Sequence, residues 1–298
     1  MIKLHIEPRT VMTWEEFQQI KPPYSVALDG YVNDATQRNP QGPYANFDHH
    51  SHVDRISTRS TSEQIHLEIN LGLFDTFRQN GKPCMNVFVN DCDEDTTIST
   101  WLLMNHERVV YHADPLINKL VFCGGLLDCT AGSYPFGETA QLHKMAWIFE
   151  PYRKARQEQR MSKMDEGEMR AIFESVLYRI TEYSLGNGEK AEIHNQYKVL
   201  SGGNGWVLVK ETGTSARAAM FTAGISAFVS VLSPGRYVIG RKSMWTPFPI
   251  EKIYTALNDV EGKNSWGGSN TIGGSLRGDG SSLSPEQITD VINAIVGG

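Results

Sequence analysis

Carboxylate and imidazole side chains follow several short apolar runs in the first half of this 298-residue sequence. The runs occupy residues 25–28, 86–89 and 119–123, and a further strand is expected at 44–47, directly before Asp48. Carboxylate oxygens with one or two imidazoles suit Mn²⁺ or Mg²⁺, and they suit Zn²⁺ less well in the absence of a thiolate set. The pattern therefore predicts a site for divalent cations. Its candidate residues are Asp29, Asp48, His49, His50, Asp91, Asp93 and Asp128.

The apolar runs predict strands that are buried on both faces of a parallel sheet, because their residues are continuously apolar rather than alternating. The carboxyl ends of parallel strands meet at one edge of such a sheet, and ligands bind there. At least four carboxylates would then share a small space, and they would repel one another unless cations were bound. Two cations ~3.5–4 Å apart are a common device for activating water at a phosphorus centre.

Each candidate also has a purely structural explanation when it is taken alone. An aspartate at a strand end is most often a turn former or a helix cap. The acidic segment 91–95 could be a solvated turn, and Cys92 and Cys129 are expected to pack beneath the site rather than to bind metal. The joint occurrence of these acids behind similar apolar runs favours the metal site.

Helices are predicted between the runs, so that strands and helices alternate over about residues 1–150. A capping box at residues 13–16 opens a helix that continues to about residue 20. A four-residue apolar repeat predicts a second helix over 61–78. Two more are predicted at 97–105 and 139–148. The expected fold class is α/β, with a mostly parallel sheet and flanking helices in a metal-binding domain at 1–150.

The second half of the chain predicts a helical connector and a smaller α/β domain. Residues 151–196 are first charged and then amphipathic, which is typical of exposed helices. Residues 197–298 are expected to form a substrate-binding domain, with the site in a cleft between the two domains. The elements predicted there are strands at 206–209, 227–232 and 237–239, helices at 249–260 and 285–296, and a glycine-rich loop at 262–282.

Composition excludes several classes of protein. The formal net charge of −6 provides no basic field for a long nucleic acid, although a nucleotide or short oligonucleotide is compatible with a local metal site. The four cysteines form neither a CxxC pair nor a secreted disulfide framework, which indicates a reducing cytoplasm. No membrane partner is expected, because no apolar stretch approaches the ~18 residues of a spanning helix. The oligomeric state is left open, a homodimer included.

Several of these segments resemble the DHH phosphoesterase superfamily. Phe47-Asp48-His49-His50 is similar to its DHH signature, and Asp29 matches the isolated strand-end aspartate of the family. The segment 89–100 is similar to the DxD motif, with a strand before it and a helix after it. The segment 125–136 resembles the late G-x-x-x-D-T-x-x-F motif.

The resemblance implies a pair of Mn²⁺ ions, with Mg²⁺ as the alternative. Asp29 would bridge the two ions, and Asp91 and Asp93 would bind one ion each. His49 and Asp128 would complete the second site.

The resemblance also implies how a substrate is held. His50 would lie at the phosphate, and Asp48 would orient the histidines. Residues 205–296 resemble the DHH-associated substrate domain, notably at 237–243 and in the glycine loop at 267–274, although an exposed linker is the plainer explanation of that loop. The substrate-binding residues implied there are Arg241, Gly267, Gly268, Ser269 and Arg277.

The sequence departs from the family in three places. The DxD segment follows DHH along the chain, whereas it usually comes first. Val87 replaces a histidine that often precedes DxD, and Asp95 is expected either to substitute for it as a ligand or to cap the helix near Thr97. Ser269 stands where a GGH histidine is common.

The expected function is Mn²⁺-dependent hydrolysis of phosphate esters. A phosphodiesterase acting on short oligonucleotides or nucleotides is the leading prediction, and a phosphomonoesterase is the variant within that class. The alternative from a different class is a catalytically silent nucleotide-binding or regulatory protein.

Overall fold

The computed structural model describes residues 1–130, 132, 134, 139–213, 215–276 and 278–297. The chain divides into two compact units. The first contains Met1–Cys129 and the helices that follow up to Glu192, and the second contains the chain from Ile193 onward. Both units combine helices with sheets, so the predicted α/β class is confirmed. None of the helices in the described residues has both the length and the apolar character of a membrane span.

The first unit is built on a five-stranded sheet that is parallel except at one edge. The strands predicted at 25–28, 44–47 and 86–89 are observed, and they are neighbours in this sheet. An additional strand at the N-terminus pairs with the third of them. In spatial order the strands are β1 (Ile2–Ile6), β7 (Met85–Val89), β2 (Ser25–Leu28), β4 (Tyr44–Phe47) and the antiparallel β3 (Gln37–Asn39).

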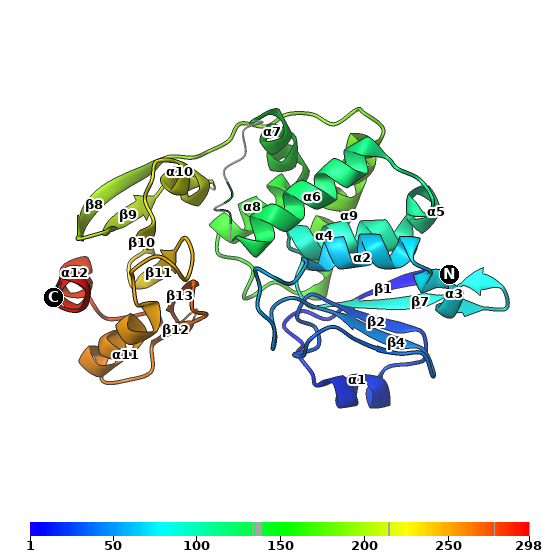
Figure 1. Ribbon diagram of the computed structural model, residues 1–298, viewed down its shortest axis with the longest axis horizontal. Coiled ribbons are helices and arrows are strands. Elements are labelled where there is room, and N and C mark those ends of the chain that lie inside the picture. Colours follow the sequence, from blue (N-terminus) through cyan, green and yellow to red (C-terminus); the bar gives the residue numbers. More distant parts are fainter. Residues whose placement is uncertain (131, 133, 135–138, 214, 277, 298) are drawn as a thin grey trace. The chain divides into compact units, whose positions relative to one another are not determined.

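Helices cover both faces of this sheet (Figure 1). On one face lies α1 (Trp14–Ile20), which Thr13 opens with the predicted capping box. Its Trp14 and Phe17 pack against Phe88 and other apolar residues of the sheet. The opposite face is covered by helices drawn from later parts of the chain, which include α2 (Thr61–Asn70), α4 (Glu94–Met104), α6 (Pro115–Cys129) and α9 (Glu166–Ser184).

The helix predicted over 61–78 ends early, because Gly72 has φ 99°, a left-handed conformation that breaks a helix. The remaining elements of the first unit are short or peripheral. They are α3 (Leu73–Thr76), the hairpin β5 (Arg78–Gln79) and β6 (Lys82–Pro83), α5 (His106–Val109), α7 (Thr139–Ile148) and α8 (Glu150–Gln157).

Two sequence predictions are corrected in this unit. The connector predicted at 151–196 is not a separate body, since its residues up to Glu192 belong to the first unit, where the buried face of α9 contacts α4, α6, α7 and β1. Residues 119–123 are not a strand, because they form the middle of α6. The buried positions of α6 include Ile117, Leu120, Val121 and Gly124, which have helical spacing. A short apolar run alone does not distinguish a strand from a buried helix.

Gly125 allows α6 to approach α2 closely. A Cβ atom at this position would lie 2.5–2.9 Å from the side-chain carbons and one oxygen of Glu63. That carboxylate accepts the backbone N–H of Ser60 in the capping box of α2. The absence of a side chain at Gly125 therefore preserves both the helix contact and the start of α2.

We expect Gly125→Ala to lower the free energy of unfolding by about 0.5–2 kcal/mol, the usual value of a lost helix cap. The added methyl group must displace Glu63 from Ser60. Urea denaturation measures this change. Gly167→Ala is the matched control, because that exposed helical glycine has 3.4 Å of room to its nearest atom. Equal stabilities for the two variants would contradict the prediction.

The second unit contains a six-stranded sheet with three helices. Strands β9 and β10 are parallel and are joined through α10, and the other neighbours are antiparallel. The glycine-rich stretch predicted as a loop contains a short hairpin, β12–β13. In spatial order the strands are β12 (Trp266–Gly268), β13 (Ile272–Ser275), β11 (Arg236–Arg241), β10 (Ala227–Ser233), β9 (Trp206–Glu211) and β8 (Tyr197–Gly203), and the helices are α10 (Ala216–Thr222), α11 (Ile250–Glu261) and α12 (Pro285–Val296).

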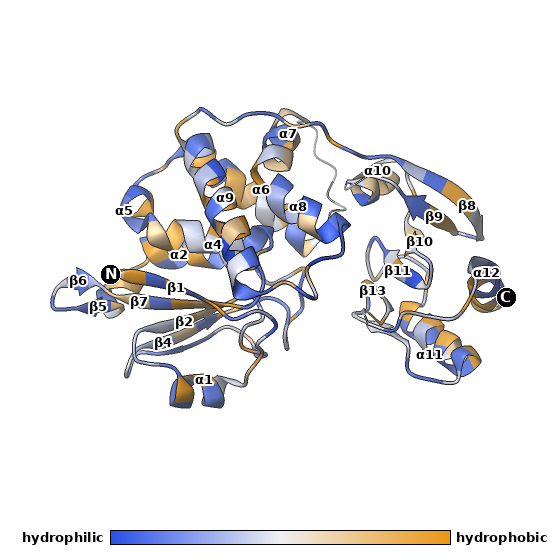
Figure 2. Ribbon diagram, turned by 180° about the vertical axis from the view of Figure 1, so that it is seen from behind, coloured by the Kyte–Doolittle hydropathy of each residue, from blue (hydrophilic) through white to orange (hydrophobic). Residues whose placement is uncertain are grey.

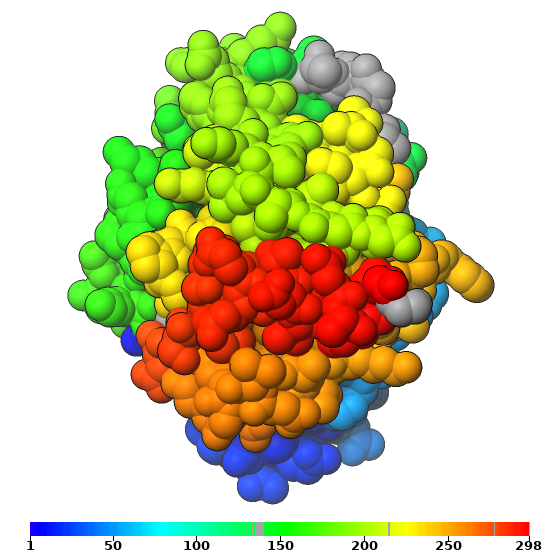
Figure 3. Space-filling view, turned by 90° about the vertical axis from the view of Figure 1, so that its left-hand side faces the viewer, coloured from blue at the N-terminus to red at the C-terminus, as the bar shows by residue number. Residues whose placement is uncertain are grey.

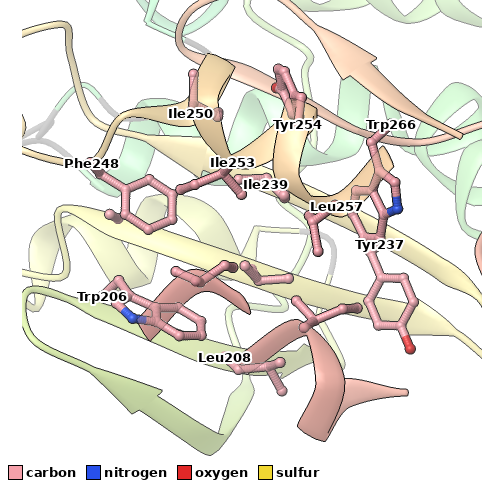
Figure 4. Close-up of a cluster of buried hydrophobic side chains, with 14 of the residues drawn as sticks. Trp206, Leu208, Tyr237, Ile239, Phe248, Ile250, Ile253, Tyr254, Leu257 and Trp266 are labelled. Atoms are coloured by element: carbon pink, nitrogen blue, oxygen red, sulfur yellow. The ribbon is translucent and has the colours of Figure 1, made fainter. Parts of the chain in front are cut away.

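The core of the second unit lies between this sheet and the two C-terminal helices. Ile253 and Leu257 of α11 face Ile239 and Trp266 in this core (Figure 4). Polar and apolar residues alternate along α11 (Figure 2), as expected of a helix with one buried side. The outer sides of α11 and α12 lie next to each other on the surface (Figure 3).

Candidate metal centre

Most of the candidate residues follow three parallel strands that end at one edge of the first sheet. Asp29 follows β2, and its backbone N–H donates to the carbonyl of Phe47 at the end of β4 (2.9 Å). The Asp48-His49-His50 segment follows β4 directly, and the acidic segment 91–95 follows β7. Because β2 lies between β4 and β7, Asp29 occupies the middle of this edge.

Asp29 is held in an unusual backbone conformation. Its φ of 52° lies in the left-handed region, which aspartate tolerates better than most residues but which still involves strain. The carboxylate is buried and accepts the hydroxyl of Thr61 (2.9 Å) on one oxygen and that of Thr96 (3.1 Å) on the other. Both sides of the carboxylate are therefore fixed in place.

His49 lies at the centre of the cluster and is fully buried. Its Nε2 lies 2.6 Å from Asp128, 3.7 Å from Asp29 and 3.8 Å from Asp95. Neither ring nitrogen has a hydrogen bond of good geometry to any described residue. A buried imidazole without hydrogen bonds, surrounded by carboxylate oxygens, is the arrangement expected of a metal ligand.

Asp95 is the buried acid of the 91–95 segment. Its two oxygens accept the backbone N–H groups of Thr61 (2.6 Å) and Ser62 (3.0 Å), the first two residues of α2. Sequence reasoning left open whether Asp95 is a ligand or caps a helix. The N-cap of α4 is Asp93, which accepts the N–H of Thr96 (2.9 Å), so Asp95 does not have that role.

Asp128 reaches the site from α6 and not, as expected, from the end of a strand. Besides its contact with His49, its carboxylate accepts two hydrogen bonds from the Nη2 group of Arg55 (3.1 and 3.2 Å). Gly125, one turn earlier on α6, permits the close helix approach that places Asp128 here. Arg55 was not a candidate from the sequence, where it is an ordinary arginine in a loop.

Two groups of ligand atoms could each hold a metal ion. One consists of Asp29, His49 and His50, and the other of His49, Asp95 and Asp128. Within each group the ligand atoms lie within 4.8 Å of one another. The His50 Nε2 atom lies 3.1 Å from Asp29, and its side chain is 35% exposed, so it is the most accessible histidine of the cluster.

The charges of the cluster perturb one another strongly. Burial would raise the pKa of Asp29, but the neighbouring His50 and His49 hold it well below its usual range. Burial would lower the pKa of His49, yet Asp128 and Asp95 raise it to about 11. A cation bound here must displace the His49 proton, because imidazole binds metal only in its neutral form.

Two further acids are destabilised as anions. Burial and then the charges of Asp29 and Asp128 raise the pKa of Asp95 to about 7. Burial and then the charges of Asp29, Asp91 and Asp128 raise the pKa of Asp93 well above its usual range. The carboxylates at this edge therefore repel one another when ionised, and a bound divalent cation would reduce that repulsion.

The other sequence candidates in this unit have more local contacts. Asp91 is half-buried and accepts the N–H of Cys92 (2.6 Å). Asp48 is fully buried, and one of its oxygens accepts the N–H of Ser51 (2.9 Å). Its other oxygen has no hydrogen bond to the residues the structure describes. Cys92 is buried beside the acids, whose charges together with burial raise the pKa of its thiol.

Thr61 and Thr96 are site residues that sequence reasoning did not identify. Thr61 contacts Asp29 through its hydroxyl and Asp95 through its backbone N–H. Thr96 contacts the second oxygen of Asp29. The only sequence signal for Thr61 is its place after Ser60, the N-cap of α2.

The substrate-binding residues predicted from the sequence lie in the second unit. Arg241 donates to the backbone carbonyls of Asn270 (2.6 Å) and Phe248 (3.1 Å), so it supports the β12–β13 hairpin. Gly267 and Gly268 end β12, and the N–H of Ser269 donates to Ile272 across the turn (2.9 Å). Arg277 lies outside the described residues, as does Phe136 of the late motif.

Comparison with known proteins adds no assignment. No family model matches the chain, and no curated protein matches it either. Among solved structures, the chain is similar to the crystal structure of an uncharacterized protein from Helicobacter pylori G27, with 12% identity over 92% of this chain and 98% of that one. The TM-score of 0.21 is too low to support an argument on fold or function.

Proposed function

We propose that this chain is a metal-dependent phosphoesterase of the DHH type, which hydrolyses phosphodiester bonds in short oligonucleotides or nucleotides. The observation that carries the proposal is the convergence of Asp29, His49, Asp95 and Asp128 at the carboxyl edge of a parallel sheet. The backbone strain at Asp29 supports a functional site over a structural acidic cluster, as do the buried ring nitrogens of His49, which form no hydrogen bond of good geometry with the described residues.

The donor set fits two Mn²⁺ ions, with Mg²⁺ as the alternative. It contains carboxylate oxygens and imidazole nitrogens, whereas the buried thiol of Cys92 beside it has a raised pKa and remains protonated. Bound divalent cations would supply Lewis acidity and a water of lowered pKa. The two groups share His49, so one of them must be completed by another acid. Asp93 and Asp91 are the acids whose charges contribute there.

The remaining residues position these ligands and the substrate. Thr61 and Thr96 fix the orientation of the Asp29 carboxylate. His50 is partly exposed and next to Asp29, so it is placed to donate a hydrogen bond to a phosphate oxygen. Asp48 anchors the turn that carries both histidines through Ser51.

The order of the motifs along the chain does not prevent this assembly. The DxD-like segment follows β7, which is later in sequence than β4, but β7 lies directly beside β2 in the sheet. Parallel neighbours present their carboxyl ends together regardless of their order in the chain. The DxD-like segment therefore lies beside Asp29 in space, although it follows the Asp48-His49-His50 segment in sequence.

Metal content and a substrate panel test the proposal. The full chain is purified, stripped with a chelator and titrated with Mn²⁺ by calorimetry, and then assayed with dinucleotides, cyclic dinucleotides, a nucleotide 3′-phosphate and pyrophosphate. We expect Mn²⁺ binding and Mn²⁺-dependent cleavage of at least one diester. Mn²⁺ binding or nucleotide binding without any cleavage would favour the silent nucleotide-binding alternative. The absence of Mn²⁺ binding would refute the proposal.

A further inference from the structure

Arg55 supplies a permanent positive charge at the edge of the acidic cluster. It lies in the segment between His50 and α2, which contains turns and bends but no regular element. Its guanidinium Nη2 contacts both oxygens of Asp128, whose carboxylate in turn lies 2.6 Å from His49. The Arg55 side chain is 33% exposed, so it is accessible from solvent as well as from the cluster.

The guanidinium has more N–H donors than its hydrogen bonds to the described residues use. An arginine side chain has five N–H donors in a planar fork, and Asp128 receives only those of Nη2. The Nε atom is buried and has no hydrogen bond to any residue that the structure describes. A buried donor without a partner is unfavourable and calls for an explanation such as a ligand that binds there.

A purely structural role explains Arg55 poorly. A partly exposed ion pair contributes about 0–1 kcal/mol to stability, and Arg55 in this position leaves its Nε unsatisfied. Burial raises the pKa of Asp128, whereas the contact with His49 and, to a smaller extent, the charge of Arg55 lower it.

We propose that Arg55 binds the phosphoryl oxygens of the substrate. This inference rests on the proposed phosphoesterase function. A phosphate group that approaches this edge is repelled by the carboxylates of the cluster, and Arg55, which is 33% exposed and contacts Asp128, offers it positive charge from the protein itself. Arginine keeps its charge at every accessible pH, and its fork matches two oxygens of a phosphate. Arg55 is thus a determinant of substrate affinity contributed by the first unit itself.

Binding of inorganic phosphate to the Mn²⁺-loaded full chain tests this role without requiring turnover. We expect Arg55→Gln to weaken phosphate binding about 10- to 100-fold, the range of a charged hydrogen bond, and to raise KM for the cleaved diester similarly. Arg55→Lys should recover only part of the affinity, because it restores charge without the fork. Mn²⁺ affinity should be unchanged or increased, since Asp128 loses a competing partner.

Arg59→Gln is the matched control, because Arg59 is an exposed arginine in the same segment. It should leave phosphate affinity unchanged, and circular dichroism should show that all variants are folded. If wild-type protein binds Mn²⁺ and cleaves a diester but Arg55→Gln binds phosphate normally, the inference on Arg55 fails and the proposed function stands. If Arg55→Gln lowers the Mn²⁺ affinity but binds phosphate normally, the inference also fails, and Arg55 acts only by positioning Asp128. If wild-type protein binds no Mn²⁺, both proposals fail.

Discussion

Replacing Asp93 by asparagine is expected to abolish Mn²⁺ binding and hydrolysis while the fold remains intact. Asparagine caps helices as well as aspartate does, so the hydrogen bond from Thr96 to residue 93 survives. The substitution removes only the negative charge that a hard cation requires. We expect activity to fall by more than the roughly 10–100-fold that loss of a supporting residue causes. Calorimetric Mn²⁺ titration and diesterase assays measure the two effects.

The same variant should be more stable than the wild type in the absence of metal. The folded-state pKa of Asp93 is raised, so its ionisation opposes folding at any pH above the unfolded value of about 3.9. The gain in the free energy of unfolding should therefore be present at neutral pH and vanish below about pH 4. Asp165→Asn is the control, because Asp165 caps α9 in the same way and is not among the candidate metal ligands. Full activity in Asp93→Asn would overturn the metal-dependent mechanism.

Trp101→Ala is expected to be the most destabilising single change in the first unit, at about 3–5 kcal/mol. Trp101 is 1% exposed on α4, and its indole N–H donates to Thr181 of α9 (2.9 Å). Removal of the ring leaves a cavity between the two helices and takes one hydrogen-bond donor from the Thr181 hydroxyl, which still donates to the Leu177 carbonyl (3.0 Å). Because α4 also carries Asp95, looser packing should weaken metal binding as well. Chemical denaturation with and without Mn²⁺ measures both consequences.

Trp245→Ala is the matched control for this substitution. Trp245 is 94% exposed, so its removal should change the stability by no more than about 0.5 kcal/mol. Thr181→Val separates the hydrogen bond from the packing, and we expect about 0.5–1.5 kcal/mol for it. A cost for Trp101→Ala close to that of Thr181→Val would show that packing at this position contributes little.

The parts of the centre that depend on local sequence could be predicted. Apolar runs placed β2 and β7 correctly, and the strand expected before Asp48 is observed as β4, so the parallel arrangement placed Asp29 and His49 at one edge. Capping signals located the starts of α1 and α12 because they are satisfied within four residues. These features need no knowledge of distant contacts.

Other parts depend on contacts between segments that are distant in sequence. Asp128 was expected at a strand end but reaches His49 from a helix, through an approach that Gly125 permits. The sequence pattern identified Asp91, Asp93 and Asp95 as candidates but did not show which of them faces His49. That depends on the residue at which α4 begins. Arg55 could not be found from the sequence, since the path of an irregular loop determines where its side chain lies.

The place of β7 in the first sheet sets the order in which the centre can be assembled during synthesis. β7 lies between β1 and β2, and Ile2 pairs with Met85 across a long stretch of chain. When β1, β2 and β4 have been made, the native sheet still lacks the strand that joins β1 to β2. Closing that gap requires a large loop to be ordered before its contacts form, which is a slow kind of step. Asp29 and His49 are thus present in the growing chain well before the acids that complete their surroundings, and the proposed cation site is complete only in a nearly finished first unit.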